Sequence, residues 1–262
     1  MHRDLRSKRI LITGASSGIG RCLAEQAAAE GAQVILSARS AGILEELAKS
    51  LQDRGFQAIS VPADVTVEED RQRVLQSAVD RFGGLDVLIN NAGISGPTAP
   101  VEEIELADWE RTIAIDLNGM FYCTRKAVPL LKAAGGGSII NLSSVAGRLG
   151  YPLRTPYAAA KWAVVGFTKS LAMELGPANI RVNAIQPGIV EGERIERVIS
   201  AKAKALGVSF DDYKQQLLSK VSLRRTVSPA DIANMALFLA TEAGRNISGQ
   251  ALSVCGNVES LA

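Results

Sequence analysis

Residues 10 to 20 read Ile10-Leu11-Ile12-Thr13-Gly14-Ala15-Ser16-Ser17-Gly18-Ile19-Gly20 and decide the fold of this chain. The apolar start predicts a short buried strand, and the apolar spacing that follows Gly20 predicts a helix. A glycine-rich turn between strand and helix lets the backbone approach a phosphate, which then faces the helix N-terminal N–H groups. The stretch therefore indicates a phosphate site, although its Gly-x-x-x-Gly-x-Gly spacing differs from the ordinary dinucleotide pattern.

Strand and helix patterns alternate along the rest of the chain. Further strands are expected at 33–38, 58–61, 87–89, 138–142, 180–185 and 251–254, and helices at 43–54, 68–82, 109–132, 156–175 and 229–240. Such alternation predicts a parallel α/β sheet of about seven strands, doubly wound and Rossmann-like, with helices on both faces. We expect a single domain over 1–262, in which 9–190 bind cofactor and carry catalysis and a charged, mostly helical insertion at 191–222 binds substrate.

Ligands of doubly wound sheets bind beyond the carboxyl ends of the strands. Five marker residues stand at such ends, namely Gly14, Arg39, Asn90, Ser144 and Pro187. Because they come from five separate strands, we expect them to share one site.

The end of the second expected strand bears on the choice of cofactor. NAD-binding folds carry an acidic residue there for the ribose 2′-hydroxyl, but this chain has Ala38 followed by Arg39. An arginine suits a 2′-phosphate, so the sequence predicts NADP as the cofactor, with NAD as the alternative. The interpretation without a function is that Arg39 is a solvated side chain at a strand end. Asp64 and Val65 follow the next strand and are expected at the adenine edge.

A second motif carries acid–base chemistry. Tyr157 precedes Lys161 by four residues on an expected helix, which places both side chains on one face. A lysine cation near a phenol stabilises the phenolate and makes the tyrosine a usable acid and base. The hydroxyl of Ser144 is expected to polarise the same carbonyl. Alone, such a Tyr-x-x-x-Lys pair is more often a solvated helix face.

Composition excludes several classes of function. A net charge of +2 argues against a nucleic-acid partner, and no apolar run reaches the roughly 18 residues that span a membrane. We find no signal-peptide pattern and expect a cytoplasmic protein. The only histidine is His2, so histidine-based triads and histidine-ligated metals are excluded, and we expect no metal. The three cysteines are far apart and form no Cys-x-x-Cys pair.

Taken together, these motifs resemble the classical short-chain dehydrogenase/reductase family over about residues 9–256. They are Thr13-Gly14-x-x-x-Gly18-x-Gly20, Asn90-Asn91-Ala92-Gly93, Ser144, Tyr157-x-x-x-Lys161 and Pro187-Gly188. The resemblance implies NAD(P)-dependent oxidation or reduction at an alcohol or carbonyl carbon, with Tyr157 as general acid/base and Ser144 polarising the substrate oxygen. It also implies that Lys161 holds the nicotinamide ribose. The implied cofactor-binding residues are Gly14, Ser16, Ser17, Gly18, Ile19, Gly20, Arg39, Asp64, Val65, Asn90, Gly93, Tyr157, Lys161, Pro187, Gly188 and Val190.

Three residues depart from the family pattern. Asp116 stands where the family has a catalytic Asn, and we expect it roughly 7 Å from Lys161, with an attraction of about 2 kcal/mol at an effective dielectric near 20. Gly192 replaces a Thr that touches the carboxamide in many members. Cys255-Gly256-Asn257 replaces the usual Asp-Gly-Gly, with consequences for packing or assembly.

The leading function is an NADP(H)-dependent oxidoreductase that interconverts a secondary alcohol and its ketone. Arg148, Arg154, Arg194 and Arg197 favour an anionic substrate, although salt bridges to neighbouring glutamates explain such arginines equally well. The alternative within the class is a 3-oxoacyl-(acyl-carrier-protein) reductase. Met173 argues against this alternative, because a basic residue that docks the carrier protein is expected at that position. A non-catalytic NADP-binding scaffold is the alternative of another class. The resemblance further implies a homotetramer paired through the two long helices.

Overall fold

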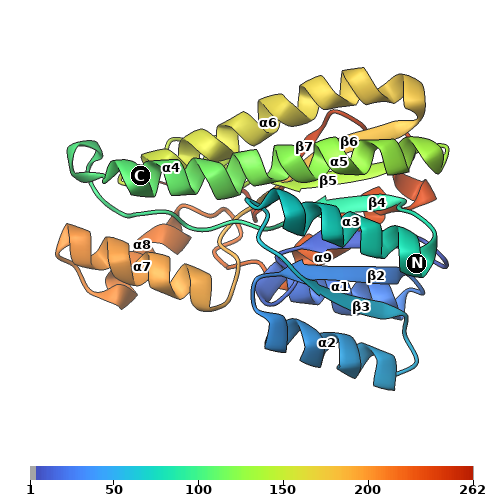
Figure 1. The fold of residues 1–262 in the computed structure, drawn as a ribbon. Coiled ribbons are helices and arrows are strands. Elements are labelled where there is room, and N and C mark those ends of the chain that lie inside the picture. Colours follow the sequence, from blue (N-terminus) through green and yellow to red (C-terminus); the bar gives the residue numbers. More distant parts are fainter. Residues whose placement is uncertain (1–3, 262) are drawn as a thin grey trace.

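The computed structural model describes residues 4–261, and its centre is one parallel sheet of seven strands (Figure 1). The strands are β1 (Arg9–Thr13), β2 (Gln33–Ala38), β3 (Ala58–Pro62), β4 (Val87–Asn90), β5 (Gly137–Leu142), β6 (Ile180–Pro187) and β7 (Ala251–Val254). Their order is β3-β2-β1-β4-β5-β6-β7, so the chain reverses direction across the sheet between β1 and β4. This confirms the predicted doubly wound fold, and such a reversal is the usual place for a ligand.

Nine α-helices lie in the described part of the chain. They are α1 (Gly18–Ala29), α2 (Ala41–Asp53), α3 (Glu68–Phe82), α4 (Leu106–Ile113), α5 (Gly119–Ala133), α6 (Thr155–Leu175), α7 (Glu193–Leu206), α8 (Phe210–Ser219) and α9 (Pro229–Ala240). Apolar residues of α1, α2 and α9 form one buried cluster against the sheet, and those of α3, α5 and α6 form a second. The sheet is therefore covered on both faces, which explains its near-continuous apolar strands.

The expected single helix at 109–132 is interrupted. The five residues Ala114–Asn118 form a π-helical turn between α4 and α5. A π-turn inserts an extra residue into the helical ladder and re-aims the side chains within it, and such turns are frequent at functional sites. Here the re-aimed side chain is that of Asp116, which is fully buried.

A third apolar cluster lies beyond the sheet. It joins α7 and α8 to the segment 145–157 and to the C-terminal segment 255–261. Figure 1 shows α7 and α8 as a pair projecting from one end of the sheet. Within residues 4–261, no helix is both long and apolar enough to cross a membrane. His2 lies outside the described residues.

Candidate active site

The turn after β1 has a backbone that only glycine permits at two positions. Gly14 has φ +67°, and a Cβ there would lie 2.9 Å from Ala92 Cα. A Cβ on Gly20 would lie 2.1 Å from the Gly14 carbonyl oxygen, which is far inside van der Waals contact. The first turn of α1 can therefore pack onto the loop and present its N–H groups, the arrangement that binds a phosphate. Ser16, Ser17, Gly18 and Ile19 lie on this loop and on the start of α1.

Asn91 and Thr13, which stand in the sequence motifs but were given no role there, hold this turn. Asn91 Nδ2 donates to the carbonyl oxygens of Thr13 and Gly14, at 3.0 Å each. Thr13 Oγ1 accepts from the backbone N–H groups of Asn91 and Ala92, also at 3.0 Å. The signal was the second Asn of Asn90-Asn91-Ala92-Gly93, which directly follows β4, the neighbour of β1 in the sheet.

The side chain of Asn90 contacts different residues from those that Asn91 contacts. Its Nδ2 donates to Thr124 Oγ1 at 3.0 Å and to Asn141 Oδ1 at 2.9 Å, and the side chain is buried. Asn141 in turn donates to Thr168 Oγ1. The Asn90 side chain therefore ties β4, β5, α5 and α6 together under the site, while Gly93 three residues later lies beside Asp116 and Lys161.

The nucleotide end of the site contains one uncommitted cation. Arg39 is exposed and has no hydrogen-bond or ion-pair partner among the described residues. The Asp64 carboxylate accepts from the backbone N–H and the hydroxyl of Thr66, at 2.9 and 2.7 Å. Val65 packs against Gly119, where an added Cβ would lie 2.7 Å from Val65 Cγ2. Of these three residues, Arg39 is the one whose side chain has no partner within residues 4–261.

The predicted catalytic side chains come from the end of β5 and the start of α6. Lys161 Nζ lies 5.5 Å from the centroid of the Tyr157 ring, on the same helix face, as the spacing predicts. It is buried and donates to the carbonyl oxygen of Leu142 at 3.1 Å. Ser144 begins the turn after β5 and its Oγ accepts from the Ala146 N–H at 3.1 Å. Ser143, the neighbour of Ser144, donates through Oγ to the Lys161 carbonyl at 2.8 Å, so the strand end that carries Ser144 lies against the helix of Tyr157 and Lys161.

Asp116 is much closer to Lys161 than expected. The distance from its Oδ2 to Lys161 Nζ is 3.5 Å, so the expectation of roughly 7 Å is wrong. The other carboxylate oxygen, Oδ1, accepts from the Ile94 N–H at 2.7 Å. Oδ2 has no hydrogen-bond partner among the described residues. The π-turn is the reason, because it directs the side chain of Asp116 inward to the lysine. The result is a buried ion pair beneath the catalytic tyrosine.

The strand end on the other side of the cofactor position is tightly packed. Pro187 ends β6, and Gly188 N–H donates to the Val254 carbonyl at 3.0 Å. A Cβ on Gly188 would lie 2.7 Å from Cys255 Cα, so only glycine fits there. Val190 pairs with Val227 in an isolated parallel bridge. Gly192, with φ +124°, occupies backbone space that L residues rarely adopt, which accounts for the missing Thr.

The arginines predicted to bind substrate have different contacts in the structure. Arg148 donates to the Val258 carbonyl at 2.9 Å and to Cys255 Sγ, which ties it to the C-terminal segment. Arg194 donates to the Gly93 carbonyl at 2.6 Å, across the cofactor position. Arg154 is buried between the rings of Tyr151 and Tyr157. Of the three, Arg154 alone contacts a catalytic side chain.

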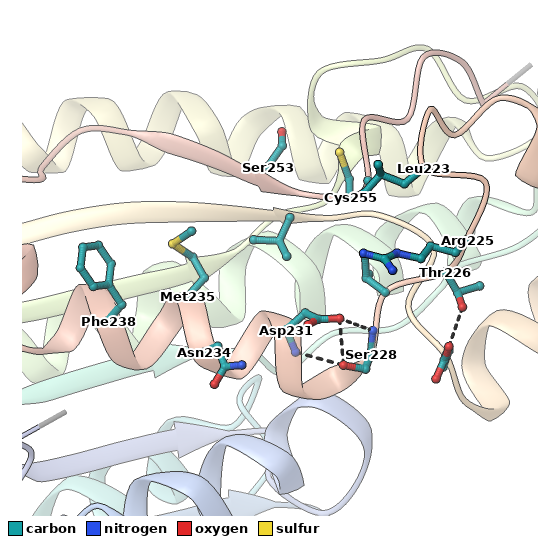
Figure 2. Close-up of a pocket in the computed structure, with 14 residues that line it drawn as sticks. Leu223, Arg225, Thr226, Ser228, Asp231, Asn234, Met235, Phe238, Ser253 and Cys255 are labelled. Atoms are coloured by element: carbon teal, nitrogen blue, oxygen red, sulfur yellow. Dashed lines mark hydrogen bonds between the residues drawn. The ribbon is translucent and has the colours of Figure 1, made fainter. Parts of the chain in front are cut away.

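One hollow in the described structure lies away from these side chains. It has a volume of about 750 Å³ and opens between α9, β7 and the segment before α9 (Figure 2). Its wall includes Met235, Phe238 and Val254, and the capping box of Ser228 and Asp231 stands at one end. None of the predicted catalytic residues lines it, so volume alone does not locate the active site.

A Rossmann sheet with a glycine turn at its switch point and a Ser-Tyr-Lys group at the next strand ends defines a nicotinamide-dependent oxidoreductase. The family model for short chain dehydrogenases matches residues 8–203, and the chain belongs to that family. Its members are NAD(P)-dependent oxidoreductases that act on alcohol and ketone groups.

Individual relatives cover nearly the whole chain. A 3-oxoacyl-(acyl-carrier-protein) reductase of Staphylococcus aureus is 37% identical over 96% of this chain and 98% of its own length. A trans-4-hydroxycyclohexanecarboxylate dehydrogenase of Sinomonas cyclohexanicum is 39% identical over 95% and 92%. Among solved structures, a 7 alpha-hydroxysteroid dehydrogenase complexed with NADH and 7-oxo glycochenodeoxycholic acid is 32% identical, covers 100% of this chain and 98% of that one, and superposes with a TM-score of 0.90.

Proposed function

We propose that this protein is an NADP(H)-dependent oxidoreductase that interconverts a secondary alcohol and its ketone. The single observation that carries the proposal is the convergence of Ser144, Tyr157 and the buried Lys161 next to the Gly14 turn. In the oxidation direction, the Tyr157 phenolate takes the proton of the substrate hydroxyl while Ser144 Oγ–H donates to the same oxygen. The nicotinamide, when bound, supplies or accepts the hydride.

The residues present fit this cofactor. Gly14 and Gly20 let α1 pack closely onto the turn, Gly18 faces open space in which an added Cβ would meet nothing within 4 Å, and α1 presents its N-terminus there for the pyrophosphate. Arg39 would bind the 2′-phosphate, Asp64 and Val65 would border the adenine, and Lys161 would hold the nicotinamide ribose. Gly93, Pro187, Gly188 and Val190 would flank the nicotinamide. Under this proposal, 9–190 form the cofactor and catalytic part, 191–222 cover the substrate, and the protein works in the cytoplasm.

Arg39 gives a test of the cofactor. A charge-assisted contact to a phosphate contributes about 1.5–3 kcal/mol, so we expect kcat/KM with NADP to exceed that with NAD at least tenfold. Arg39→Ala should lose most of this preference by weakening NADP while leaving NAD within about twofold. Arg245→Ala, an exposed arginine paired with Glu242, is the matched control. Equal or better efficiency of the native enzyme with NAD would refute the NADP assignment.

A second candidate is supported by the S. aureus relative, whose name gives a carrier-bound 3-oxoacyl substrate. Carrier proteins are acidic, and docking one requires basic residues on the helices beside the active site. Met173 on α6 is 82% exposed at a place where such a residue is expected. We therefore rank this activity second. A marked preference for carrier-bound over free oxoacids would select it.

Assembly as a homotetramer is also proposed, paired through α5 and α6. Phe121 on α5 and Trp162 on α6 are 44% and 51% exposed, and Phe121 meets Phe167 edge-to-face at 6.2 Å. Val164 is excluded from the outer face because it is buried. Exposed aromatic side chains on neighbouring helices are typical of an interface between copies. Light scattering at micromolar concentration should give four times the chain mass, whereas a monomer would contradict the pairing.

A further inference from the structure

Two cations are buried beside the proposed active site. Arg154 immediately precedes α6 and is 2% exposed, and Lys202 on α7 is 3% exposed. A buried charge is strongly unfavourable unless a counter-charge and hydrogen bonds compensate it. Among residues 4–261, neither cation forms an ion pair with a carboxylate. The pair thus places uncompensated positive charge inside the protein.

The contacts of both cations are neutral. Arg154 donates through Nη2 to the Ser95 carbonyl and through Nη1 to Thr98 Oγ1 at 3.4 Å, while its buried Nε has no partner in the described structure. Lys202 Nζ donates to the Leu261 carbonyl at a long 3.5 Å. The ring of Tyr151 lies against both, 5.4 Å from the guanidinium carbon and 4.4 Å from the ammonium. Hydrogen-bonding capacity is therefore left over on both side chains.

The neighbouring phenols do not supply the missing negative charge. Burial raises the pKa of Tyr151 to about 12 and also raises the pKa of Tyr213, whose ring lies 5.8 Å from Lys202 Nζ. Both stay protonated at neutral pH. Burial, with the nearby charges of Arg154 and Lys220, lowers the pKa of Lys202 to about 8. At neutral pH the cluster therefore remains cationic, and residues 4–261 place no anion beside it.

We propose that Arg154 and Lys202 bind the anionic group, a carboxylate or sulfonate, of a small hydroxy acid or oxo acid whose reacting carbon faces Tyr157. The guanidinium carbon of Arg154 lies 5.5 Å from the centroid of the Tyr157 ring, so the anionic group sits only a few bonds from the reacting carbon. The Nε–H of Arg154, which has no partner among the described residues, can donate a charge-assisted hydrogen bond to such an oxyanion, and Lys202 adds a point charge. This assignment rests on the proposed function and narrows its substrate class.

The rest of the molecule agrees with this choice of residues. Arg148 is tied to the C-terminal segment and Arg197 is exposed and paired with Glu193 on the surface of α7. Arg194 reaches Gly93 at the cofactor position instead. Among the relatives, the Sinomonas enzyme carries a hydroxy acid in its name. An extended acyl thioester would leave the two buried cations unpaired, which further disfavours the carrier-bound alternative.

Kinetics on matched substrates test the assignment. We expect oxidation of 3-hydroxybutyrate or a 2-hydroxyalkanesulfonate to exceed that of the neutral methyl ester or a secondary alcohol at least about thirtyfold in kcat/KM. Arg154→Gln and Arg154→Lys should lower kcat/KM for the anions by that factor or more, and Lys202→Met by about tenfold, with neutral alcohols changed less than about threefold. Arg197→Gln, on the same helix as Lys202, should match the native enzyme. The better anion identifies carboxylate or sulfonate.

The melting temperature of Lys202→Met distinguishes a ligand-binding role of Lys202 from a purely structural one. If Lys202 served only to anchor Leu261, Lys202→Met would melt lower than the native protein. An unpaired buried cation instead predicts that Lys202→Met melts higher without ligand. Because folding depresses the Lys202 pKa to about 8, the unfolded chain holds that proton at higher pH, and native stability rises as the pH goes from 8 toward 10. The advantage of Lys202→Met should therefore shrink over that range.

Ligand binding without turnover completes the test. With NADP⁺ present, acetoacetate or propanesulfonate should raise the melting temperature of the native protein and of Arg197→Gln but not of Arg154→Gln or Lys202→Met. Neutral substrates turned over as well as anions, or no anion-induced shift, would overturn the anion site while leaving the oxidoreductase proposal intact. NADPH that binds and is oxidised by no ketone would instead defeat the oxidoreductase proposal, and the melting shift would still decide the anion site.

Discussion

Tyr157→Phe should lower kcat/KM about 10³–10⁴-fold while leaving NADPH binding within about threefold of the native value. The substitution removes only the phenolic oxygen, so the ring keeps its place between Arg154 and Lys161. What is lost is the group that exchanges the proton of the substrate oxygen, and general acid–base catalysis contributes about this factor. NADPH fluorescence measures the binding and cofactor absorbance the turnover.

The matched control is Tyr122→Phe on α5, which removes a phenolic oxygen from a ring that lies under Arg71, 4.6 Å from the guanidinium carbon. It should retain nearly native kinetics. Retention of more than a tenth of the native kcat/KM by Tyr157→Phe would mean that another group handles the proton, and the buried carboxylate of Asp116 would then be the first alternative.

Substitution of Asp116 should have the second large effect on stability and activity, because Asp116 forms a buried ion pair with Lys161 at 3.5 Å. Asp116→Leu leaves the lysine as an unpaired buried cation and deprives the Ile94 N–H of its acceptor. Breaking a buried pair in this way destabilises a protein by about 3–5 kcal/mol. We expect this variant to unfold at much lower urea concentration, with most of its activity lost.

Asp116→Asn separates the charge from the geometry. The amide oxygen can still accept from the Ile94 N–H, so the fold and substantial activity should be retained. Without the carboxylate, the Lys161 charge acts more fully on the Tyr157 phenolate. The rise of alcohol oxidation with pH should therefore move toward lower pH. The measurement is kcat/KM against pH for the native enzyme and for Asp116→Asn. An inactive variant, or one with an unmoved pH profile, would show that Asp116 itself contacts substrate or takes the proton.

Much of the fold could be predicted because its signals are local. Apolar runs such as Ile10-Leu11-Ile12 fix buried strands, and their alternation with helical patterns fixes a parallel sheet. The positions of Gly14, Asn90 and Ser144 then follow from the rule that parallel strands end at one edge. These predictions needed no knowledge of tertiary contacts.

The unpredicted parts of the site depend on contacts between distant segments. The close approach of Asp116 to Lys161 comes from a π-turn, which is a shift in backbone hydrogen bonding without a clear residue signature. Arg148 and Arg154 lie in the same loop, yet one turns to the C-terminal segment and the other to the catalytic tyrosine. Lys202 was missed because an isolated lysine on a charged helix reads as a surface residue until the fold buries it.

Isotope transfer tests whether this protein moves a hydride between the nicotinamide and a carbonyl carbon. The native enzyme is incubated with NADPH deuterated at C4 of the nicotinamide and a panel of small oxo acids and neutral ketones, and the alcohol products are analysed by mass spectrometry. With the native enzyme, we expect deuterium to move to the carbinol carbon of the product formed from an oxo acid. Tyr157→Phe should bind the cofactor but transfer almost no deuterium. Tight NADPH binding with no deuterium in any product would contradict it, because a scaffold binds the cofactor without using its hydride.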